Sequence, residues 1–211
     1  MRGPGVGARR ALPGGAAVVR LLLATRNPGK LVELRRMLSG FEVVGLADVP
    51  EFPDAPETGA TFAENALAKA RDAAAATGLA SVADDSGLAV DALNGMPGVL
   101  SARWSGRHGD DRANLDLLLA QLGDVPDDRR GAAFVCAAAL VVPGGAETVV
   151  HGEWFGRIVR AARGVNGFGY DPIFVPAGDE RTSAELDPAE KDAASHRALA
   201  LAALLPHLRG L

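Results

Sequence analysis

The sequence has a single cysteine, Cys136, so it can form no internal disulfide. Aromatic residues are also scarce, at 5% of the chain, and no apolar run approaches the ~20 residues that a membrane helix needs. The longest apolar stretch, 132–142, is predicted to be a buried strand in which the cysteine thiol is inert packing. These absences argue against a disulfide scaffold and a membrane protein, and they favour the reducing cytoplasm.

An excess of positive charge is missing as well. The 22 Lys and Arg residues are outnumbered by 26 Asp and Glu residues, which gives a net charge of -4. This balance argues against broad nucleic-acid binding, which needs a basic surface. It is compatible with a small anionic substrate, because a few local cations or a metal can override the global sign. With 211 residues, 48% of them hydrophobic, the chain is long and apolar enough to bury a core.

The first 19 residues differ in composition from the rest. They are rich in Gly, Pro, Arg and Ala and lack the continuous apolar segment of a secretory signal. We expect residues 1–19 to be a flexible tail, or an overextended gene start, without a function of its own. Residues 20–211 are expected to form a single two-lobed domain.

Hydrophobic patterning predicts alternating strands and helices along the remaining chain. Asn27 and Pro28 are typical of a helix start, and Thr61 with Glu64 forms a capping box at another. Residues 84–98 are expected to be rich in turns. The early strand–helix units and a later hairpin predict an α/β fold with a mixed central sheet and helices on both faces. Helices are expected at 28–38, 61–78, 110–122 and 188–208, and strands at 18–24, 41–44, 81–83, 132–142, 148–155 and 173–175.

The segment TRNPGK (25–30) joins the first predicted strand to the first helix. Free backbone N–H groups and the positive end of the helix dipole make such a junction a potential anion site. The ammonium of Lys30 and the polar groups of Thr25 and Asn27 would add donors. The alternative is an ordinary capped helix with a surface lysine.

Adjacent carboxylates, Asp84 and Asp85, follow the third predicted strand and precede Ser86 and a glycine. Two such carboxylates are costly to hold together unless a metal ion or cations pair with them. Carboxylate oxygens suit Mg²⁺, which also binds substrate phosphates, and Glu57 in the loop before the second helix could complete the site. The alternatives are an Asx-turn with solvated carboxylates and an ordinary surface glutamate.

Two further segments carry side chains suited to a nucleotide base. The loop GFGYDP (167–172) could lay an aromatic ring against a base, or could be a turn with a core phenylalanine. Lys191, His196 and Arg197 could hold phosphate or purine oxygens, or form an exposed basic face. At 100° per residue, one straight helix cannot aim these three side chains at one point. Either the helix starts after Lys191, or the side chains reach different parts of a ligand.

Together these segments resemble the inosine/xanthosine triphosphate pyrophosphatase family, whose members hydrolyse non-standard purine nucleoside triphosphates. Six motifs in order over most of the chain carry the resemblance. They are TRNPGK (25–30), ETGATFAENALAKA (57–70), ADDSGLAVDAL (83–93), PGVLSARWSG (97–106), GFGYDPIF (167–174) and AEKDAASHR (189–197). Arg26 departs from the pattern, since many bacterial members have a small residue there, and it could add a cation near the phosphates.

The resemblance implies an elongated sheet with two lobes around a central cleft, a homodimer, and Mg²⁺ as cofactor, with Mn²⁺ as a substitute. The implied reaction converts dITP, ITP or XTP to the monophosphate and pyrophosphate in the cytoplasm, without nucleic acid or membrane as a partner. Asp85 is the implied proton acceptor, and Glu57, Asp84 and Asp85 are the implied metal positions. The implied substrate contacts are Thr25, Arg26, Asn27, Pro28, Gly29, Lys30, Lys69, Ser86, Phe168, Gly169, Tyr170, Asp171, Lys191, His196 and Arg197.

Two alternatives stay open at this stage. One is a Maf-type pyrophosphatase on a similar fold that acts on pyrimidine triphosphates, against which the SHR and GFGYDP segments argue. The other is a nucleotide-binding module without catalysis, against which the set of acids and lysines argues. Trp104 and Arg103 in segment 97–106 are of types enriched at interface centres. This segment is therefore expected either near the dimer interface or in the core of one lobe.

Overall fold

The computed structural model describes residues 19–38, 40–53 and 56–211. The predicted tail therefore lies outside the described residues, apart from Val19. The strands are β1 (Arg20–Leu23), β2 (Glu42–Gly45), β3 (Ala80–Val90), β4 (Gly131–Val141), β5 (Glu147–Ile158) and β6 (Phe174–Pro176). The α-helices are α1 (Pro28–Met37), α2 (Phe62–Thr77), α3 (Asp111–Gln121), α4 (Pro188–Ala194) and α5 (His196–Arg209). The short 3₁₀ helices are η1 (Leu46–Asp48), η2 (Asp91–Leu93), η3 (Gly98–Arg103), η4 (Asp127–Arg129) and η5 (Asp171–Ile173).

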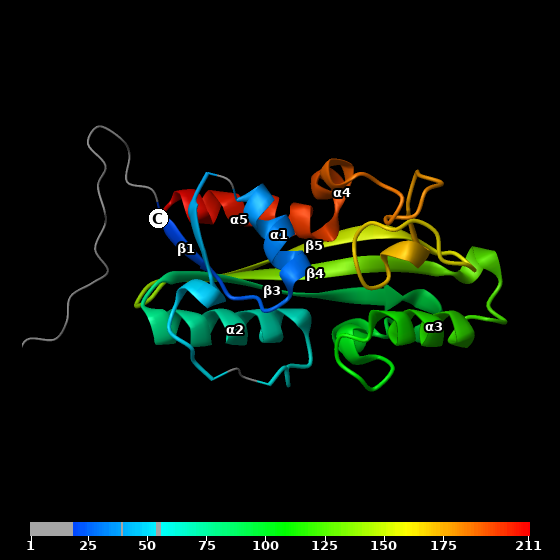
Figure 1. Ribbon diagram of the computed structural model, residues 1–211, viewed down its shortest axis with the longest axis horizontal. Coiled ribbons are helices and arrows are strands. Elements are labelled where there is room, and N and C mark those ends of the chain that lie inside the picture. Colours follow the sequence, from blue (N-terminus) through cyan, green and yellow to red (C-terminus); the bar gives the residue numbers. More distant parts are fainter. Residues whose placement is uncertain (1–18, 39, 54–55) are drawn as a thin grey trace, which may run out of the picture.

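The strands form one sheet in the order β2-β1-β3-β4-β5-β6. β1 is parallel to β2 and β3, whereas the other neighbouring strands are antiparallel. Helices α1, α4 and α5 cover one face of the sheet, and α2 and α3 cover the other (Figure 1). The predicted α/β fold, with an elongated mixed sheet and helices on both faces, is confirmed. Among the described residues, no helix is long and apolar enough to cross a membrane.

β1 ties both helical layers to the sheet, because successive side chains of a strand point to opposite faces. Leu21 and Leu23 belong to the apolar cluster that includes Leu201 of α5, while Leu22 belongs to the cluster that includes Ala70 of α2. The three leucines of β1 are fully buried. Each contributes about 1.5–3 kcal/mol by burial, so the apolar strand predicted here is central to the core.

Helix α2 begins and ends where the sequence predicts. Thr61 Oγ1 accepts a hydrogen bond from the N–H of Glu64 at 3.1 Å and so caps the first turn. Gly78 ends the helix with a φ of 68°, a left-handed conformation that glycine adopts without strain. Between these caps, buried alanines such as Ala66 and Ala73 face the sheet, and their small side chains let the helix lie close to it.

A third apolar cluster fills the lobe at the far end of the sheet. The ring of Phe174 lies 4.6 Å from that of Phe134 and 5.5 Å from that of Trp154, centroid to centroid. Trp104 packs against this cluster, and its Nε1 donates a hydrogen bond to Gln121 Oε1 at 2.8 Å. Of the two expectations for Trp104, the single chain supports packing in the core of one lobe.

The strand predicted at 81–83 is much longer than expected. β3 continues to Val90, so Asp84 and Asp85 lie within a strand, and the prediction of turns at 84–98 is wrong up to that point. The local preference of Asp, Ser and Gly for turns is overridden because β4 pairs with almost the whole of β3.

The single helix predicted at 188–208 is in fact two helices. Ser195 has an extended backbone, with φ −68° and ψ 158°, and its Oγ accepts a hydrogen bond from the N–H of Ala198 at 3.3 Å. Serine favours this capping position over a helix interior, which explains the break between α4 and α5. The break removes the geometric difficulty of the straight helix, because it lets Lys191 and Arg197 reach the same carboxylate, Glu33.

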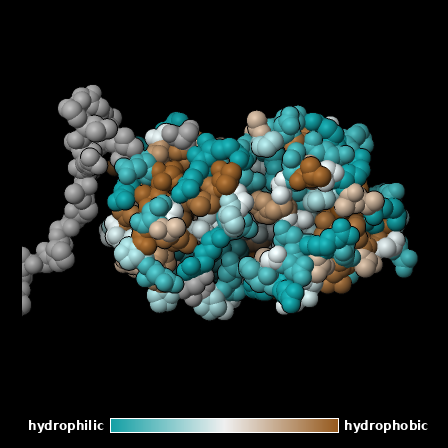
Figure 2. Space-filling model, in the orientation of Figure 1, coloured by the Kyte–Doolittle hydropathy of each residue, from teal (hydrophilic) through white to brown (hydrophobic). Residues whose placement is uncertain are grey.

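A cleft opens where β1 ends. β1 pairs with β3 only at 80–82. Further along the same edge of β3, the next contact is from η3, where Ser101 Oγ accepts the N–H of Leu88 at 2.9 Å. The cleft between the two lobes has a volume of about 500 Å³, within the range of small-molecule sites. Figure 2 shows the surface hollowed between the two halves of the molecule.

Candidate active site

Asp84 and Asp85 point to opposite faces of the sheet. Their partners across the β3–β4 ladder are Ala138 and Ala137, which belong to opposite apolar layers. The side chain of Asp84 therefore faces α1 and α5, while that of Asp85 faces α2. Both line the cleft, because the cleft lies at the open edge of β3. This alternation relieves the repulsion expected of adjacent carboxylates, and each acid has its own cations.

The N-terminus of α1 lies at the cleft. Asn27 Oδ1 accepts a hydrogen bond from the N–H of Lys30 at 3.2 Å and caps the helix, with Pro28 in its first turn. Thr25 Oγ1 accepts the N–H of Asn27 at 3.3 Å. Lys30 Nζ lies 3.0 Å from Asp84 Oδ2. The predicted capped start is confirmed, and it brings an ammonium group and a helix N-terminus to the same place.

On the α2 face, Lys69 joins two carboxylates. Its Nζ lies 2.9 Å from Glu57 Oε1 and 3.0 Å from Asp85 Oδ1. Arg103 of η3 adds a second cation, with Nη1 3.3 Å from Glu57 Oε2. A loop, a helix and a strand that are distant in sequence thus bring Glu57, Lys69 and Asp85 together.

The pKa values of this group reflect burial and close charges. Burial raises the pKa of Asp85 above its ordinary value, although Lys69 opposes the shift. Burial would also raise the pKa of Glu57, but Lys69, with Lys30 and Arg103, outweighs it and lowers that pKa. Burial disfavours the ammonium of Lys69, yet Asp85 and its neighbours raise the pKa of the lysine. The lysine therefore stays charged between the two acids.

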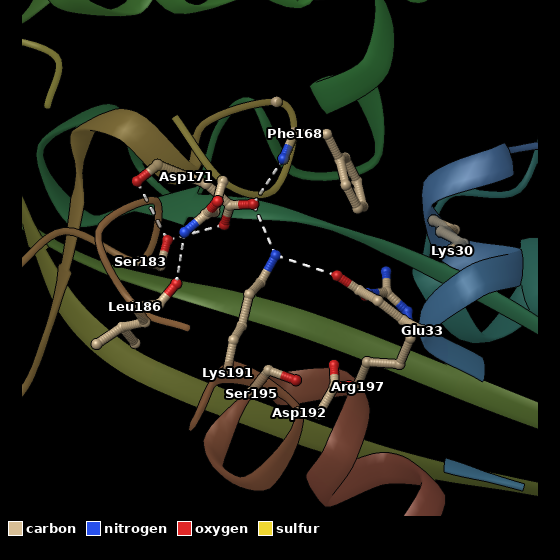
Figure 3. Close-up of polar contacts among 12 residues, drawn as sticks. Lys30, Glu33, Phe168, Asp171, Ser183, Leu186, Lys191, Asp192, Ser195 and Arg197 are labelled. Carbon is tan, nitrogen blue, oxygen red and sulfur yellow. Dashed lines mark hydrogen bonds and ion pairs between the residues drawn. The ribbon is translucent and has the colours of Figure 1, made fainter. Parts of the chain in front are cut away.

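A chain of alternating charges crosses the other face of the sheet. Arg197 Nε lies 3.3 Å from Asp84 Oδ2, and its Nη1 donates to Glu33 Oε2. Lys191 Nζ lies 3.2 Å from Glu33 Oε1 and 2.6 Å from Asp171 Oδ2 (Figure 3). All five residues are buried. Each buried charge has opposite charges beside it, which offsets the cost of removing it from water.

Asp84 also contacts Lys30. Burial would raise the pKa of Asp84, but Lys30, Arg197 and Lys69 hold it well below its ordinary range. Asp84 is therefore a carboxylate at any physiological pH. The same burial raises the pKa of the neighbouring thiol, Cys136, to about 12, which confirms that the single cysteine is an inert core residue.

Asp171 shapes the loop that carries Phe168. Its Oδ2 accepts the N–H of Phe168 at 2.8 Å, and its Oδ1 accepts the hydroxyl of Ser183 at 2.8 Å. The Phe168 ring lies at the cleft, with Lys191 Nζ 5.1 Å from its centroid. A Cβ on Gly29 would stand 2.9 Å from Phe168 Cδ1, so glycine lets the ring close against α1. The aromatic ring thus faces the cleft rather than the core.

Two other residues of this loop are anchored through their polar groups. The hydroxyl of Tyr170 donates to the carbonyl of Ser101 at 2.9 Å, and burial raises its pKa. The N–H of Gly169 donates to Asp111 Oδ2 at 2.9 Å. Both residues line the cleft, with the Tyr170 hydroxyl and the Gly169 N–H already bonded within the protein.

Two buried polar atoms at the cleft have no hydrogen-bond partner among the described residues, Asp84 Oδ1 and His196 Nδ1. The His196 ring stacks on Phe134, with centroids 4.9 Å apart and planes at 13°. Burial, with Arg197 and Lys191, lowers the pKa of His196 well below its ordinary value, so the imidazole is neutral. Unpaired buried atoms are costly, so both are suited to pair with polar groups of a ligand.

The donor set for a metal ion is small. The described residues hold no group of three or more His, Cys, Asp or Glu side chains arranged around one point. Mg²⁺, however, is commonly held by one or two carboxylates together with substrate phosphates. Glu57 and Asp85 fit that role, since both reach Lys69 Nζ within 3.0 Å. Asp84, predicted with them, lies on the other face of β3 and does not join this pair.

Most of the site residues predicted from the sequence line one cleft. Pro28 and Gly29 are the exceptions. Several residues in contact with the predicted set were missed, among them Glu33, Asn65 and Arg103. Glu33 was detectable, because it follows Lys30 by three positions on one helix and so shares its face. The predicted residues that line the cleft are Thr25, Arg26, Asn27, Lys30, Glu57, Lys69, Asp84, Asp85, Ser86, Phe168, Gly169, Tyr170, Asp171, Lys191, His196 and Arg197.

The fold and the cleft define an α/β protein that can hold a ligand with an anionic end and an aromatic end. Residues 21–207 match the model of the Ham1 family, and the chain belongs to this family. The dITP/XTP pyrophosphatase of Nocardia farcinica is 69% identical over 199 residues, which cover 92% of this chain and 97% of the relative.

Solved structures agree with this assignment. The crystal structure of the nucleoside-triphosphatase / dITP/XTP pyrophosphatase from Mycobacterium abscessus is 68% identical, has a TM-score of 0.74, and covers 89% of this chain and 100% of that chain. The Ham1 protein of Staphylococcus aureus is 40% identical, with a TM-score of 0.81, and covers 90% of this chain and 98% of that chain. The family resemblance seen in the sequence is confirmed.

Proposed function

We propose that this protein hydrolyses dITP, ITP and XTP to the nucleoside monophosphate and pyrophosphate, and so clears non-standard purines from the nucleotide pool. One observation carries the proposal. At the open edge of β3, the cleft joins an acid–lysine group on the α2 face to a buried, donor-rich pocket on the α1 and α5 face. The names of the N. farcinica and M. abscessus relatives support the substrate class.

The triphosphate is proposed to lie between the N-terminus of α1 and Lys69. It brings about four negative charges, which must be neutralised as charge moves onto the leaving group. Lys30, Lys69 and Arg103 supply cations there, and the first N–H groups of α1 add donors. Arg26, which lines the cleft, supplies a further cation.

Asp85 is proposed to accept a proton from the attacking water. Its raised pKa makes it a better base than an exposed aspartate, while Lys69 favours its ionised form. The water oxygen bonds to phosphorus, the anhydride bond between the α- and β-phosphates breaks, and pyrophosphate and the monophosphate separate. Mg²⁺, or Mn²⁺ in its place, when held by Glu57, Asp85 and phosphate oxygens, would stabilise the developing negative charge.

The purine is proposed to lie against Phe168, near Lys191, His196 and Arg197. The favoured purines share a 6-oxo acceptor where adenine has an amino donor. A pocket built to donate hydrogen bonds rejects adenine, because its buried donors would be left unpaired. The guanidinium of Arg197 is fixed at this pocket by its contacts, which include a hydrogen bond from its Nη2 to Ser86 Oγ at 3.1 Å.

Turnover of a nucleotide panel with and without Mg²⁺ tests the proposal. Pyrophosphate release from ITP, dITP and XTP should exceed that from ATP and GTP, and should need the metal. Preference for dTTP or UTP would identify a Maf-type activity instead. Tight ITP binding without pyrophosphate release would identify a non-catalytic binding module.

We further propose that the protein is a cytoplasmic homodimer. A two-fold dimer is the commonest closed assembly of soluble proteins, and the family resemblance favours it. The cytoplasm is the compartment that holds the nucleotide pool on which the proposed activity acts. Sedimentation at low micromolar concentration tests the dimer, and cell fractionation tests the compartment.

A further inference from the structure

One buried amide connects the two acids of the α2 face. Asn65 lies on α2 with 3% of its surface exposed. Its Nδ2 donates to Asp85 Oδ2 at 3.1 Å, and its Oδ1 accepts the N–H of Gly59 at 2.8 Å. Gly59 lies two residues after Glu57, so the same side chain contacts the strand acid and anchors the loop of the other acid.

The loop is closed tightly onto this amide. A Cβ on Gly59 would stand 2.6 Å from Asn65 Oδ1 and 2.8 Å from Glu64 Cβ, so no side chain fits there without displacement. Close packing as well as the hydrogen bond therefore fixes the distance between the Gly59 N–H and the Asn65 side-chain carbonyl.

These contacts close a ring. Asp85 Oδ2 meets Asn65, Asp85 Oδ1 meets Lys69 at 3.0 Å, and Lys69 meets Glu57 Oε1 at 2.9 Å. The backbone from Glu57 to Gly59 then returns to Asn65. Lys69 is a long, flexible member of this ring and is drawn toward any phosphate that enters. Asn65 is short, buried and bonded at both ends.

We infer that Asn65 is a positioning residue, which sets the orientation of the Asp85 carboxylate and its separation from Glu57. The inference rests on the proposed function of this acid pair. The Asn65 amide orients Oδ2 of Asp85 and leaves Oδ1 on the side of the cleft. Outer-shell groups of this kind typically change metal affinity or activity by about 10- to 100-fold when removed.

The chain offers a matched control in Asn114. This asparagine is also buried, at 2% exposure, and its Oδ1 accepts a loop N–H, that of Ser105, at 2.7 Å. Its Nδ2 donates to a backbone carbonyl, that of Ala102, at 3.2 Å instead of to a carboxylate. Asn65→Leu and Asn114→Leu therefore remove equivalent loop anchors, but only the first removes a donor to Asp85.

The test measures Mn²⁺ binding, from the electron paramagnetic resonance signal of free Mn²⁺, with a non-hydrolysable methylene analogue of ITP present. It also measures kcat and KM for ITP and the melting temperature. Asn65→Leu should weaken Mn²⁺ binding and lower kcat, each by about 10- to 100-fold, with a smaller change in KM. Asn114→Leu should lower the melting temperature similarly but change Mn²⁺ affinity much less, because its loop reaches Glu57 only through Arg103.

Asn65→Asp provides a second variant, because it keeps the volume and the acceptor for Gly59 but replaces the donor to Asp85 with a carboxylate oxygen, which repels Asp85. Its kcat should also fall. Wild-type Mn²⁺ affinity and kcat in the Asn65 variants, or equal losses in the Asn114 control, would overturn the inference. A wild-type protein that releases no pyrophosphate from ITP would instead overturn the proposed function, and the inference with it.

Discussion

Glu33 Oε1 lies 3.2 Å from Lys191 Nζ, and this buried contact joins helix α1 to helix α4. The other oxygen of Glu33 accepts from Arg197. One carboxylate therefore contacts two cations, one from each of two helices. It connects the proposed phosphate side of the cleft to the proposed base side, both mechanically and electrostatically.

Glu33→Gln keeps the shape of this side chain and removes its charge. Lys191 and Arg197 would then share fewer anions in a buried site, so we expect a loss of about 1–3 kcal/mol in the free energy of unfolding. Glu42→Gln is the control, because its pair with Arg20 is half exposed and should contribute less than about 1 kcal/mol. Urea denaturation measures both, and equal effects of the two substitutions would contradict the expectation.

Asp85→Asn removes the charge and basicity of the proposed proton acceptor. We expect kcat for ITP to fall by at least ~10², the scale of a lost general base. The variant should still fold but with a lower melting temperature, because the amide keeps one acceptor oxygen for Asn65 or Lys69 and turns its NH₂ group toward the other donor. Pyrophosphate release by the purified variant measures the effect, and a kcat near that of the wild type would remove Asp85 from the mechanism.

Arg197→Ala tests base selection, but the structure adds a second effect. The guanidinium is 1% exposed and lies between Asp84 and Glu33, so its removal takes one of the cations from each of these two buried carboxylates. We expect a loss of about 3–5 kcal/mol in stability together with a smaller kcat/KM ratio of ITP over ATP. Calorimetry measures the stability, and kcat/KM for ITP and for ATP should be measured on the folded fraction. An equal fall for both nucleotides would mean that Arg197 binds phosphate or holds structure instead of selecting the base.

His196 predicts a dependence of stability on pH. Burial, followed by Arg197 and Lys191, lowers its pKa in the folded protein, whereas an unfolded histidine titrates near about 6.5. Below that pH the unfolded chain binds a proton that folded His196 does not. Stability should therefore fall with decreasing pH, by up to about 1.4 kcal/mol per unit from this group.

The matched variants for this effect are His196→Gln and His151→Gln, the second at an exposed position on β5. Unfolding free energies should be compared between about pH 7.5 and 5. The slope should flatten in His196→Gln and stay like that of the wild type in His151→Gln. Parallel slopes in all three proteins would show that His196 takes up its proton in the folded state.

Sedimentation should give twice the monomer mass of 21.7 kDa if the proposed homodimer forms. Trp104→Ala is now expected to lower stability more than association, because Trp104 is partly buried against the core cluster of one lobe. A single species at the monomer mass would refute the dimer. A Trp104→Ala variant that is monomeric but stable would instead support the prediction that segment 97–106 lies near the dimer interface.

The parts of the fold that could be predicted are those governed by local physics. The caps of α2 at Thr61 and Gly78, and that of α1 at Asn27, follow from side chains bonding neighbouring backbone groups. The length of β3 could not be predicted, because acids in a strand are acceptable only with cations such as Lys30 and Lys69 supplied by distant helices. Local preference favoured a turn, and tertiary pairing overrode it.

The site shows the same division. Motif order placed nearly all predicted side chains around one cleft, yet it could not show that Asp84 and Asp85 serve different faces. That depends on strand register with β4, which only the folded sheet fixes. Asn65 was missed because a lone asparagine in an alanine-rich helix carries no periodic signal, and its two partners are a loop N–H and a strand carboxylate.

Because β1 ends early, β3 is paired on both edges along only part of its length. At 80–82 it is an interior strand, and past that point one side of it becomes an edge until η3 takes the N–H of Leu88. Exposed edges invite pairing with other chains, and proteins usually protect them. Here the cleft itself protects the edge, because Ala83, Asp84 and Asp85 are at most 6% exposed. The opening that would admit a small ligand is thus closed to a strand of another chain.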